Sequence, residues 1–229
     1  MKSLLVILLC GSLVSGDIPA YFGKNYNKAI SSIQKDQPVI SSTCKKLNVP
    51  EDIVESIVFP EYLRSNIVSG LLEEKSLETI YVQEGSQSVD FSIGKFQIKP
   101  SFAEKLETLI DKNEFELKSK YSFLLIDKKS VTETRTIRVQ RLKNQEWQTR
   151  YICAFVEYGL KKLEIQNETR SHQIKYLATM FNCGLEKNKK EIENMFGCQC
   201  FPYGESYEID QVNYWEVSQH YYQNKNTKN

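Results

Sequence analysis

The chain has 229 residues, 41% of them hydrophobic, and carries 30 Lys and Arg against 29 Asp and Glu. This length suits one sizeable domain with a real hydrophobic core, or at most two small domains. The near-zero net charge argues against nucleic acid as the main partner, because a protein that binds nucleic acid usually presents a basic surface.

Residues 1–16 are predicted to be a secretory signal peptide. Lys2 precedes an apolar run over residues 4–9, and small residues lead up to Asp17. The run is too short to cross a membrane, and no later run approaches that length. We therefore expect an exported protein, periplasmic or extracellular, without a stable membrane span. Removal of the signal takes the basic count from 30 to 29, so the mature chain from Asp17 is formally neutral.

The cysteines and histidines do not form a metal-binding pattern. The mature chain would keep five cysteines: Cys44, Cys153, Cys183, Cys198 and Cys200. Disulfides are possible in an exported chain, but the odd count leaves one cysteine over and the pairing stays open. The two histidines, His172 and His220, do not stand at ligand spacing from the cysteines. We expect neither a metal nor a cofactor.

Helical patterns dominate the rest of the chain. Residues 17–44 are interpreted as a lead-in segment with a short helix and a loop. A helix is predicted within residues 47–61, because Pro50, Glu51 and Asp52 suit its first turn. Further helices are expected over residues 62–85, 100–109, 131–142, 147–163 and 172–184, with Gly85 and Gly184 as stops.

Two segments are harder to interpret. Residues 121–126 form an apolar run that fits either a buried helical turn or a short strand. Residues 198–229 are an aromatic-rich tail, in which tyrosines could line a sugar cleft by stacking or could pack the tail onto the domain. We expect residues 223–229 to be disordered.

Glu61 is the candidate general acid. Val54 and Ile57 share one helix face, and Glu61 continues that face one turn later. Desolvation at the end of an apolar stripe raises the pKa of a carboxylic acid, as a general acid requires. The alternative is that Pro60 ends or kinks the helix and turns Glu61 to solvent. Glu55 lies off this stripe and ranks lower.

Residues 90–102 form a loop that leads into the helix expected at Pro100. Gly94 interrupts an apolar pattern, which suggests a close backbone approach or an unusual φ. Gln97 lies among apolar residues and is a candidate ligand for substrate. The alternative is a buried turn that happens to carry Gln97.

Three segments together resemble the lysozyme-like superfamily, in particular soluble lytic transglycosylases of the Slt type. Residues 49–61 look like that family's helix ending in its catalytic glutamate. Residues 92–100, Ser-Ile-Gly-Lys-Phe-Gln-Ile-Lys-Pro, are similar to its Gly-Leu-Met-Gln-Ile-Met-Pro motif. Residues 177–184, Leu-Ala-Thr-Met-Phe-Asn-Cys-Gly, are similar to its Ala-Ala-Tyr-Asn-Ala-Gly motif. The resemblance covers roughly residues 45–195.

The resemblance implies a mainly α-helical, lysozyme-like fold with few or no strands, in a single domain over residues 45–197. It implies a monomer that acts on peptidoglycan glycan strands. Glu61 would protonate the β-1,4 bond between N-acetylmuramic acid and N-acetylglucosamine, and would then accept the proton of the C6 hydroxyl. Gly94, Gln97 and Asn182 would bind and orient substrate.

Two departures from the family pattern bear on the reaction. Tyr62 follows Glu61 where the family usually has serine, and Phe181 stands where a tyrosine is usual. The resemblance implies that Tyr81 or Tyr176 supplies the missing hydroxyl.

Three alternatives stay open at this point. A lysozyme-type hydrolase would use Asp90 to hold a water molecule, although Asp90 could equally be a cap or turn residue. An inactive glycan-binding or envelope-assembly protein could share the fold. Finally, the motif matches could be fortuitous in a helical interaction protein, in which case Glu61, Gln97 and Asn182 would not share a cleft.

Overall fold

Helix α3 (Glu51–Ile67) is the element around which the other helices pack. Residues 53–63 of α3 are buried without interruption. Four helices contact it: α2 (Lys24–Lys46), α8 (Gln145–Lys162), α9 (Arg170–Cys183) and α11 (Tyr214–Asn226). Because it is covered on all sides, its sequence is apolar almost all round rather than along one stripe. The helix continues past Pro60 and Glu61 is buried, so the alternative in which Pro60 ends the helix and turns Glu61 to solvent is wrong.

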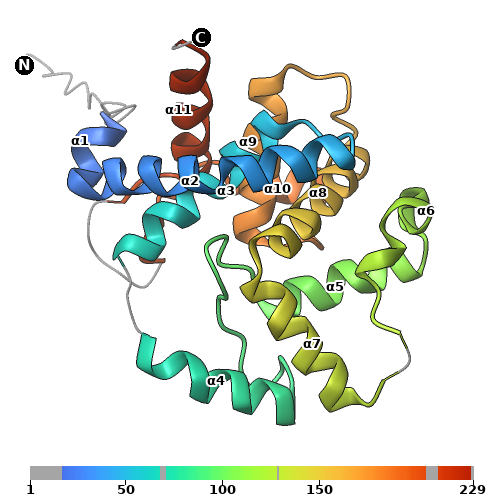
Figure 1. Ribbon diagram of the computed structural model, residues 1–229. Coiled ribbons are helices and arrows are strands. Elements are labelled where there is room, and N and C mark those ends of the chain that lie inside the picture. Colours follow the sequence, from blue (N-terminus) through green and yellow to red (C-terminus); the bar gives the residue numbers. More distant parts are fainter. Residues whose placement is uncertain (1–16, 68–70, 128, 205–210, 228–229) are drawn as a thin grey trace, which may run out of the picture.

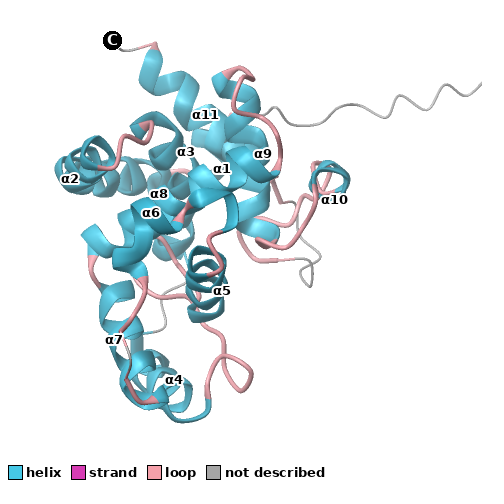
Figure 2. Ribbon diagram, turned by 90° about the vertical axis from the view of Figure 1, so that its right-hand side faces the viewer, coloured by secondary structure: helices cyan, strands magenta, loops and turns pink. Residues whose placement is uncertain are grey.

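The computed structural model describes residues 17–67, 71–127, 129–204 and 211–227. The predicted signal peptide, residues 1–16, lies outside this part of the chain. Within it the fold is one mainly helical domain (Figures 1 and 2), and extended pairing is limited to two isolated antiparallel bridges. No helix among these residues combines the length and the apolar character needed to cross a bilayer.

Most of the remaining helices begin and end close to the predicted positions, among them α5 (Pro100–Asp111) and α7 (Val131–Lys143). The helix expected over residues 62–85 is an exception, because residues 62–67 continue α3 and a separate helix, α4 (Leu71–Glu84), begins at Leu71. Gly85 ends α4 with a φ of 95°, and Gly184 follows α9 with a φ of 118°. Such positive φ values are easily adopted only by glycine, which is why these two residues are reliable stops.

Short helical segments complete the fold. The apolar run over residues 121–126 is helical rather than extended, because α6 (Lys118–Tyr121) leads into the 3₁₀ turn η2 (Ser122–Leu124). The other short elements are α1 (Ile18–Phe22), η1 (Glu114–Glu116) and α10 (Lys189–Asn194).

The lead-in segment is more regular than expected. In place of a short helix and a loop, α1 is followed by the 23-residue helix α2, which runs through Pro38. Ala29, Ile33 and Ile40 of α2 are fully or almost fully buried, because α2 packs along α3. Burial against a partner helix thus stabilises a segment whose own composition is largely polar.

The aromatic tail packs onto the domain through α11. Tyr221 stacks on Phe59 with ring centroids 4.4 Å apart, and Tyr214 is buried. Helix α11 extends to Asn226, so the expectation of disorder from residue 223 is wrong for residues 223–226. Residues 17–44 and the described part of the tail, residues 198–204 and 211–227, therefore contribute to the same hydrophobic core as residues 45–197.

Helices α4 and α7 lie at the end of the molecule away from α1 and α11 (Figure 1). A buried polar network joins this end to the rest. Arg138 of α7 donates to Glu107 of α5 at 2.6 Å and to the hydroxyl of Tyr81 of α4 at 2.7 Å. Tyr151 of α8 donates to Glu107 at 2.6 Å. Four helices are thus held together by one satisfied group of side chains.

Candidate active site

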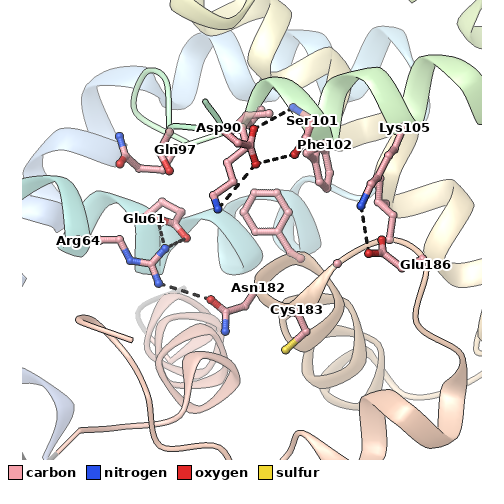
Figure 3. A pocket seen from close by; sticks show the side chains of 16 residues that line it. Glu61, Arg64, Asp90, Gln97, Ser101, Phe102, Lys105, Asn182, Cys183 and Glu186 are labelled. Carbon is pink, nitrogen blue, oxygen red and sulfur yellow. Dashed lines mark hydrogen bonds and ion pairs between the residues drawn. The ribbon is translucent and has the colours of Figure 1, made fainter. Parts of the chain in front are cut away.

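The motifs recognised in the sequence meet at a cleft of about 260 Å³. It lies between the middle of α3, the loop that leads into α5, and the C-terminal end of α9. Four of the predicted site residues line it: Glu61, Asp90, Gln97 and Asn182 (Figure 3). The other three, Gly94, Tyr81 and Tyr176, do not line it.

Glu61 lies at the inner side of the cleft and is only 3% exposed. Burial raises the pKa of its carboxyl group, whereas the positive charge of Arg64 and a hydrogen bond with Tyr214 lower it. Burial is the largest of these effects, so the net shift is upward. The direction is the one that a general acid needs near neutral pH.

Arg64 is the site residue that sequence reasoning missed. Its guanidinium donates to both oxygens of Glu61, at 2.8 and 3.0 Å, and to Oδ1 of Asn182 at 3.4 Å (Figure 3). It also lies over the ring of Phe201 at 4.9 Å. The i,i+3 spacing of Glu61 and Arg64 on one helix is the signal that could have found this pair.

Tyr214 supplies the hydroxyl beside the acid. It is almost fully buried at the start of α11, and its hydroxyl donates to the carbonyl oxygen of Ile57 at 2.8 Å. The same hydroxyl interacts with the Glu61 carboxyl and lowers its pKa. Local sequence carries no signal for this contact, because Tyr214 belongs to a helix from the other end of the chain.

Tyr81 and Tyr176 do not supply that hydroxyl, which corrects the expectation drawn from the resemblance. Tyr81 is buried away from the cleft, and its hydroxyl donates to Glu104 at 2.8 Å. The hydroxyl of Tyr176 donates to Glu193 at 2.6 Å. Both hydroxyls are engaged with carboxylates outside the cleft.

The two departures from the family pattern have different structural consequences. Tyr62 points away from the cleft, where its hydroxyl donates to Asp36 at 2.8 Å. Phe181 does line the cleft, and its ring contacts those of Phe102 and Phe155, with centroids 5.4 and 5.5 Å apart. An apolar ring at position 181 therefore continues the hydrophobic core to the cleft wall.

Asp90 lines the cleft but also holds the start of α5. Its carboxylate accepts hydrogen bonds from the backbone N–H of Ser101 at 3.1 Å and from the hydroxyl of Ser101 at 2.7 Å. The first N–H groups of a helix lack partners within the helix, so this contact stabilises α5. Lys99 lies 3.9 Å from the same carboxylate. These contacts favour the capping role that the sequence left open.

Gln97 reaches the cleft from a tight loop. Ile93 and Ile98 form an antiparallel bridge, and Gln97 lies in the turn between them with a φ of 49°. Its side-chain amide donates to the carbonyl oxygen of Gly94 at 2.7 Å. This contact holds a residue in a backbone conformation that is uncommon for any residue other than glycine.

Gly94, expected to bind substrate, does not line the cleft, and the structure gives it a packing role. Its φ is 70°, and its backbone lies against Gln148 of α8. The side chain of Gln148 accepts from the N–H of Phe96 at 2.8 Å and donates to the carbonyl oxygen of Leu142. The glycine thus allows the loop to approach α8 closely, and this approach positions Gln97.

Gly94→Ala is expected to destabilise the protein by about 2–3 kcal/mol, because a side chain would combine a positive φ with overpacking. The new Cβ would lie 1.6 Å from Nε2 of Gln148 and 2.7 Å from the carbonyl oxygen of Leu142. Urea denaturation of both proteins measures the effect. Gly197→Ala is the matched control, since a Cβ there meets nothing within 4 Å. Equal stability of the two variants would contradict the packing role.

Asn182 lies in the last turn of α9, as predicted, and lines the cleft beside Arg64.

No group of three or more His, Cys, Asp or Glu side chains among the described residues is arranged to hold a metal ion. Comparisons of the chain with protein-family models, with curated proteins and with solved structures found no match.

Proposed function

We propose that this protein is a peptidoglycan-cleaving glycosidase, a lytic transglycosylase in which Glu61 is the only catalytic carboxyl group. One observation carries the proposal: Glu61, Gln97 and Asn182, each from a different motif, line the same cleft. Fortuitous motif matches in a helical interaction protein would not bring these three residues together. The proposal includes export of the mature chain to the compartment that holds its glycan substrate.

Protonated Glu61 would donate its proton to the oxygen of the glycosidic bond as that bond breaks. The acetamido oxygen of the N-acetylmuramic acid residue would attack its own C1 atom and replace the departing sugar. The C6 hydroxyl would then displace the acetamido oxygen and give up its proton to ionised Glu61, which leaves an anhydro sugar. One carboxyl group serves both steps, which suits a cleft in which Asp90 is engaged with Ser101.

Arg64 and Tyr214 would assist the ionised form of the acid. Arg64 donates to both oxygens of the Glu61 carboxylate, which stabilises the charge that develops as the proton leaves. Burial supports the protonated form before the reaction. The site thus offers an environment for each charge state of Glu61. Gln97 and Asn182 line the cleft and would orient the sugar through the amide atoms that are not engaged with Gly94 and Arg64.

Mass spectrometry of purified peptidoglycan incubated with the chain from Asp17 onward tests this function. Anhydro-muropeptides are the expected products. Reducing-end products would instead indicate hydrolysis and would require Asp90 to leave Ser101 and hold a water molecule. The absence of both kinds of product would contradict both forms of the glycosidase proposal.

A second candidate function is glycan binding without turnover. The Glu61–Arg64 ion pair favours it, because two hydrogen bonds from a guanidinium stabilise the ionised form of a carboxyl group and so oppose donation of its proton. Binding of the protein to insoluble peptidoglycan, with no soluble products, would support this candidate.

Tyr214→Phe is expected to shift the pH dependence of cleavage upward. Its hydroxyl lowers the pKa of Glu61, so its loss raises that pKa. A higher pKa keeps the acid protonated to higher pH. The alkaline limb of the profile therefore moves to higher pH.

The pH profile of initial rates measures this shift. Tyr222→Phe is the control, because Tyr222 lies on the same helix but is not one of the groups that shift the pKa of Glu61. A downward shift in Tyr214→Phe would contradict the assigned contact.

A further inference from the structure

Two cysteines meet in the hydrophobic core, one from α2 and one from α8. The two helices pack against each other (Figure 1), and the Sγ atoms of Cys44 and Cys153 lie 3.8 Å apart. These residues are only 1% and 0% exposed. Because they are 109 residues apart in the sequence, their contact is a product of the tertiary fold and not of local chain geometry.

Neither catalysis nor metal binding explains this pair. A reactive cysteine needs a thiolate and access to its substrate. The hydrogen bond with Cys44 and burial both raise the pKa of the Cys153 thiol, and both side chains are closed to solvent. Among the described residues, no third His, Cys, Asp or Glu side chain completes a metal site with them. The pair therefore has a structural role.

The geometry of the pair is close to that of a disulfide. The contact between the two sulfur atoms accommodates only one of the two thiol hydrogens. A disulfide would remove both hydrogens and bring the sulfur atoms to about 2.05 Å. The approach needed is about 1.8 Å, a movement of the size that rotation about the two Cα–Cβ bonds can supply.

A second pair of cysteines is less informative about the fold. The Sγ atoms of Cys198 and Cys200 lie 2.7 Å apart. One residue separates these cysteines in the sequence, so the chain itself keeps them close. Cys44 and Cys153 have no such local reason to meet, and they are the pair that a disulfide would use to join distant parts of the chain.

We propose that Cys44 and Cys153 form a disulfide that links α2 to α8 in the mature chain. The proposal rests on the export that accompanies the proposed function, because structural disulfides form in oxidising compartments. It does not depend on Glu61 or on glycan cleavage.

The oxidant is a second disulfide, carried by a thiol–disulfide exchange protein or by glutathione. The thiolate of one cysteine attacks a sulfur atom of this disulfide and releases one thiolate. The other cysteine then attacks the mixed disulfide and releases the second thiolate. The S–S bond between Cys44 and Cys153 is thus formed as the oxidant is reduced to two thiols, which take up the two protons.

The bond must form while the chain folds, because the folded protein closes both sulfur atoms to an oxidant. For the same reason, the finished disulfide is closed to reductants. Dithiothreitol is expected to cleave it in urea but not in the native protein.

Peptide mapping by mass spectrometry tests the proposal. The chain from Asp17 onward is reduced in urea, refolded in a mixture of reduced and oxidised glutathione, and unfolded again with an alkylating agent. The expected result is a peptide pair that joins Cys44 to Cys153 and that dithiothreitol separates. Cys198→Ala/Cys200→Ala is the matched control and should keep this link.

The unfolding temperature gives a second measurement on the unmodified sequence. Protein refolded with glutathione is expected to unfold about 5–15 °C higher than protein refolded with dithiothreitol, because the link closes a long loop in the unfolded chain. This difference should disappear in Cys44→Ala/Cys153→Ala and remain in Cys198→Ala/Cys200→Ala.

Two outcomes of the mapping would overturn the proposal. One is alkylation of both Cys44 and Cys153 after refolding with glutathione, in which case the thiols fill core space as small apolar side chains. The other is a link from either of them to Cys183, Cys198 or Cys200. The predicted link in a protein that releases no muropeptides would support the disulfide and contradict only the glycosidase function.

Discussion

Glu61→Gln is expected to lower the rate of glycan cleavage by about 10²–10⁴-fold, the usual contribution of a general acid. The amide has nearly the same shape as the carboxyl group but has no acidic proton to donate to the glycosidic oxygen. It keeps an oxygen that can accept from Arg64, so the cleft is expected to retain its form. Quantitative mass spectrometry of muropeptides measures the effect.

Glu146→Gln is the matched control. Glu146 also pairs with an arginine on its own helix, Arg150, at 2.6 Å, but it lies outside the cleft. This variant is expected to cleave glycan at the unmodified rate. Full activity in Glu61→Gln would remove Glu61 from the mechanism and direct the next substitution to Asp90.

Arg138→Met is expected to destabilise the fold by about 3–5 kcal/mol, the cost of removing one partner from a buried ion pair. The side chains of Arg138 and Glu107 are only 7% and 10% exposed. Methionine would leave Glu107 buried with the hydroxyl of Tyr151 as its remaining donor in this network. Urea denaturation at neutral pH measures the loss.

Lys118→Met tests whether burial of the ion pair is the reason for the large loss of stability expected in Arg138→Met. Lys118 pairs with Asp111 at 2.9 Å, but these side chains are 47% and 67% exposed. An exposed pair contributes about 0–1 kcal/mol because water and salt screen it. The double variant Arg138→Met/Glu107→Leu should lose less than the sum of its single variants. Similar losses in Arg138→Met and Lys118→Met would contradict the role of the buried network.

Local sequence was enough to locate most of the helices. Pro100 suits a first helical turn, and Gly85 and Gly184 adopt positive φ values that end helices. These signals act within a few residues, through the steric limits of φ and the hydrogen bonds of a single turn. The sequence predicts too short a helix in place of α2, because the stability of α2 comes from packing against α3. The largely polar sequence of α2 does not predict that contact.

The candidate site was only partly predictable. Motif resemblance indicated Glu61, Gln97 and Asn182, and all three line the cleft. It wrongly assigned the hydroxyl beside the acid to Tyr81 or Tyr176. Tyr214 has that position, and Gly94 packs on Gln148 instead of lining the cleft.

The sequence by itself determined a mainly helical chain with a carboxyl group on the buried face of a helix. Arg64, three residues further along the same helix, is a neighbour that helix geometry alone can place beside that carboxyl group. Only the tertiary structure decided that the group is enclosed by segments from elsewhere in the chain, among them Tyr214 of the last helix. The physical reason is the distance along the chain over which each effect acts. Helix periodicity and turn chemistry act between near neighbours in the chain, whereas burial and pKa depend on residues that packing brings together from distant segments.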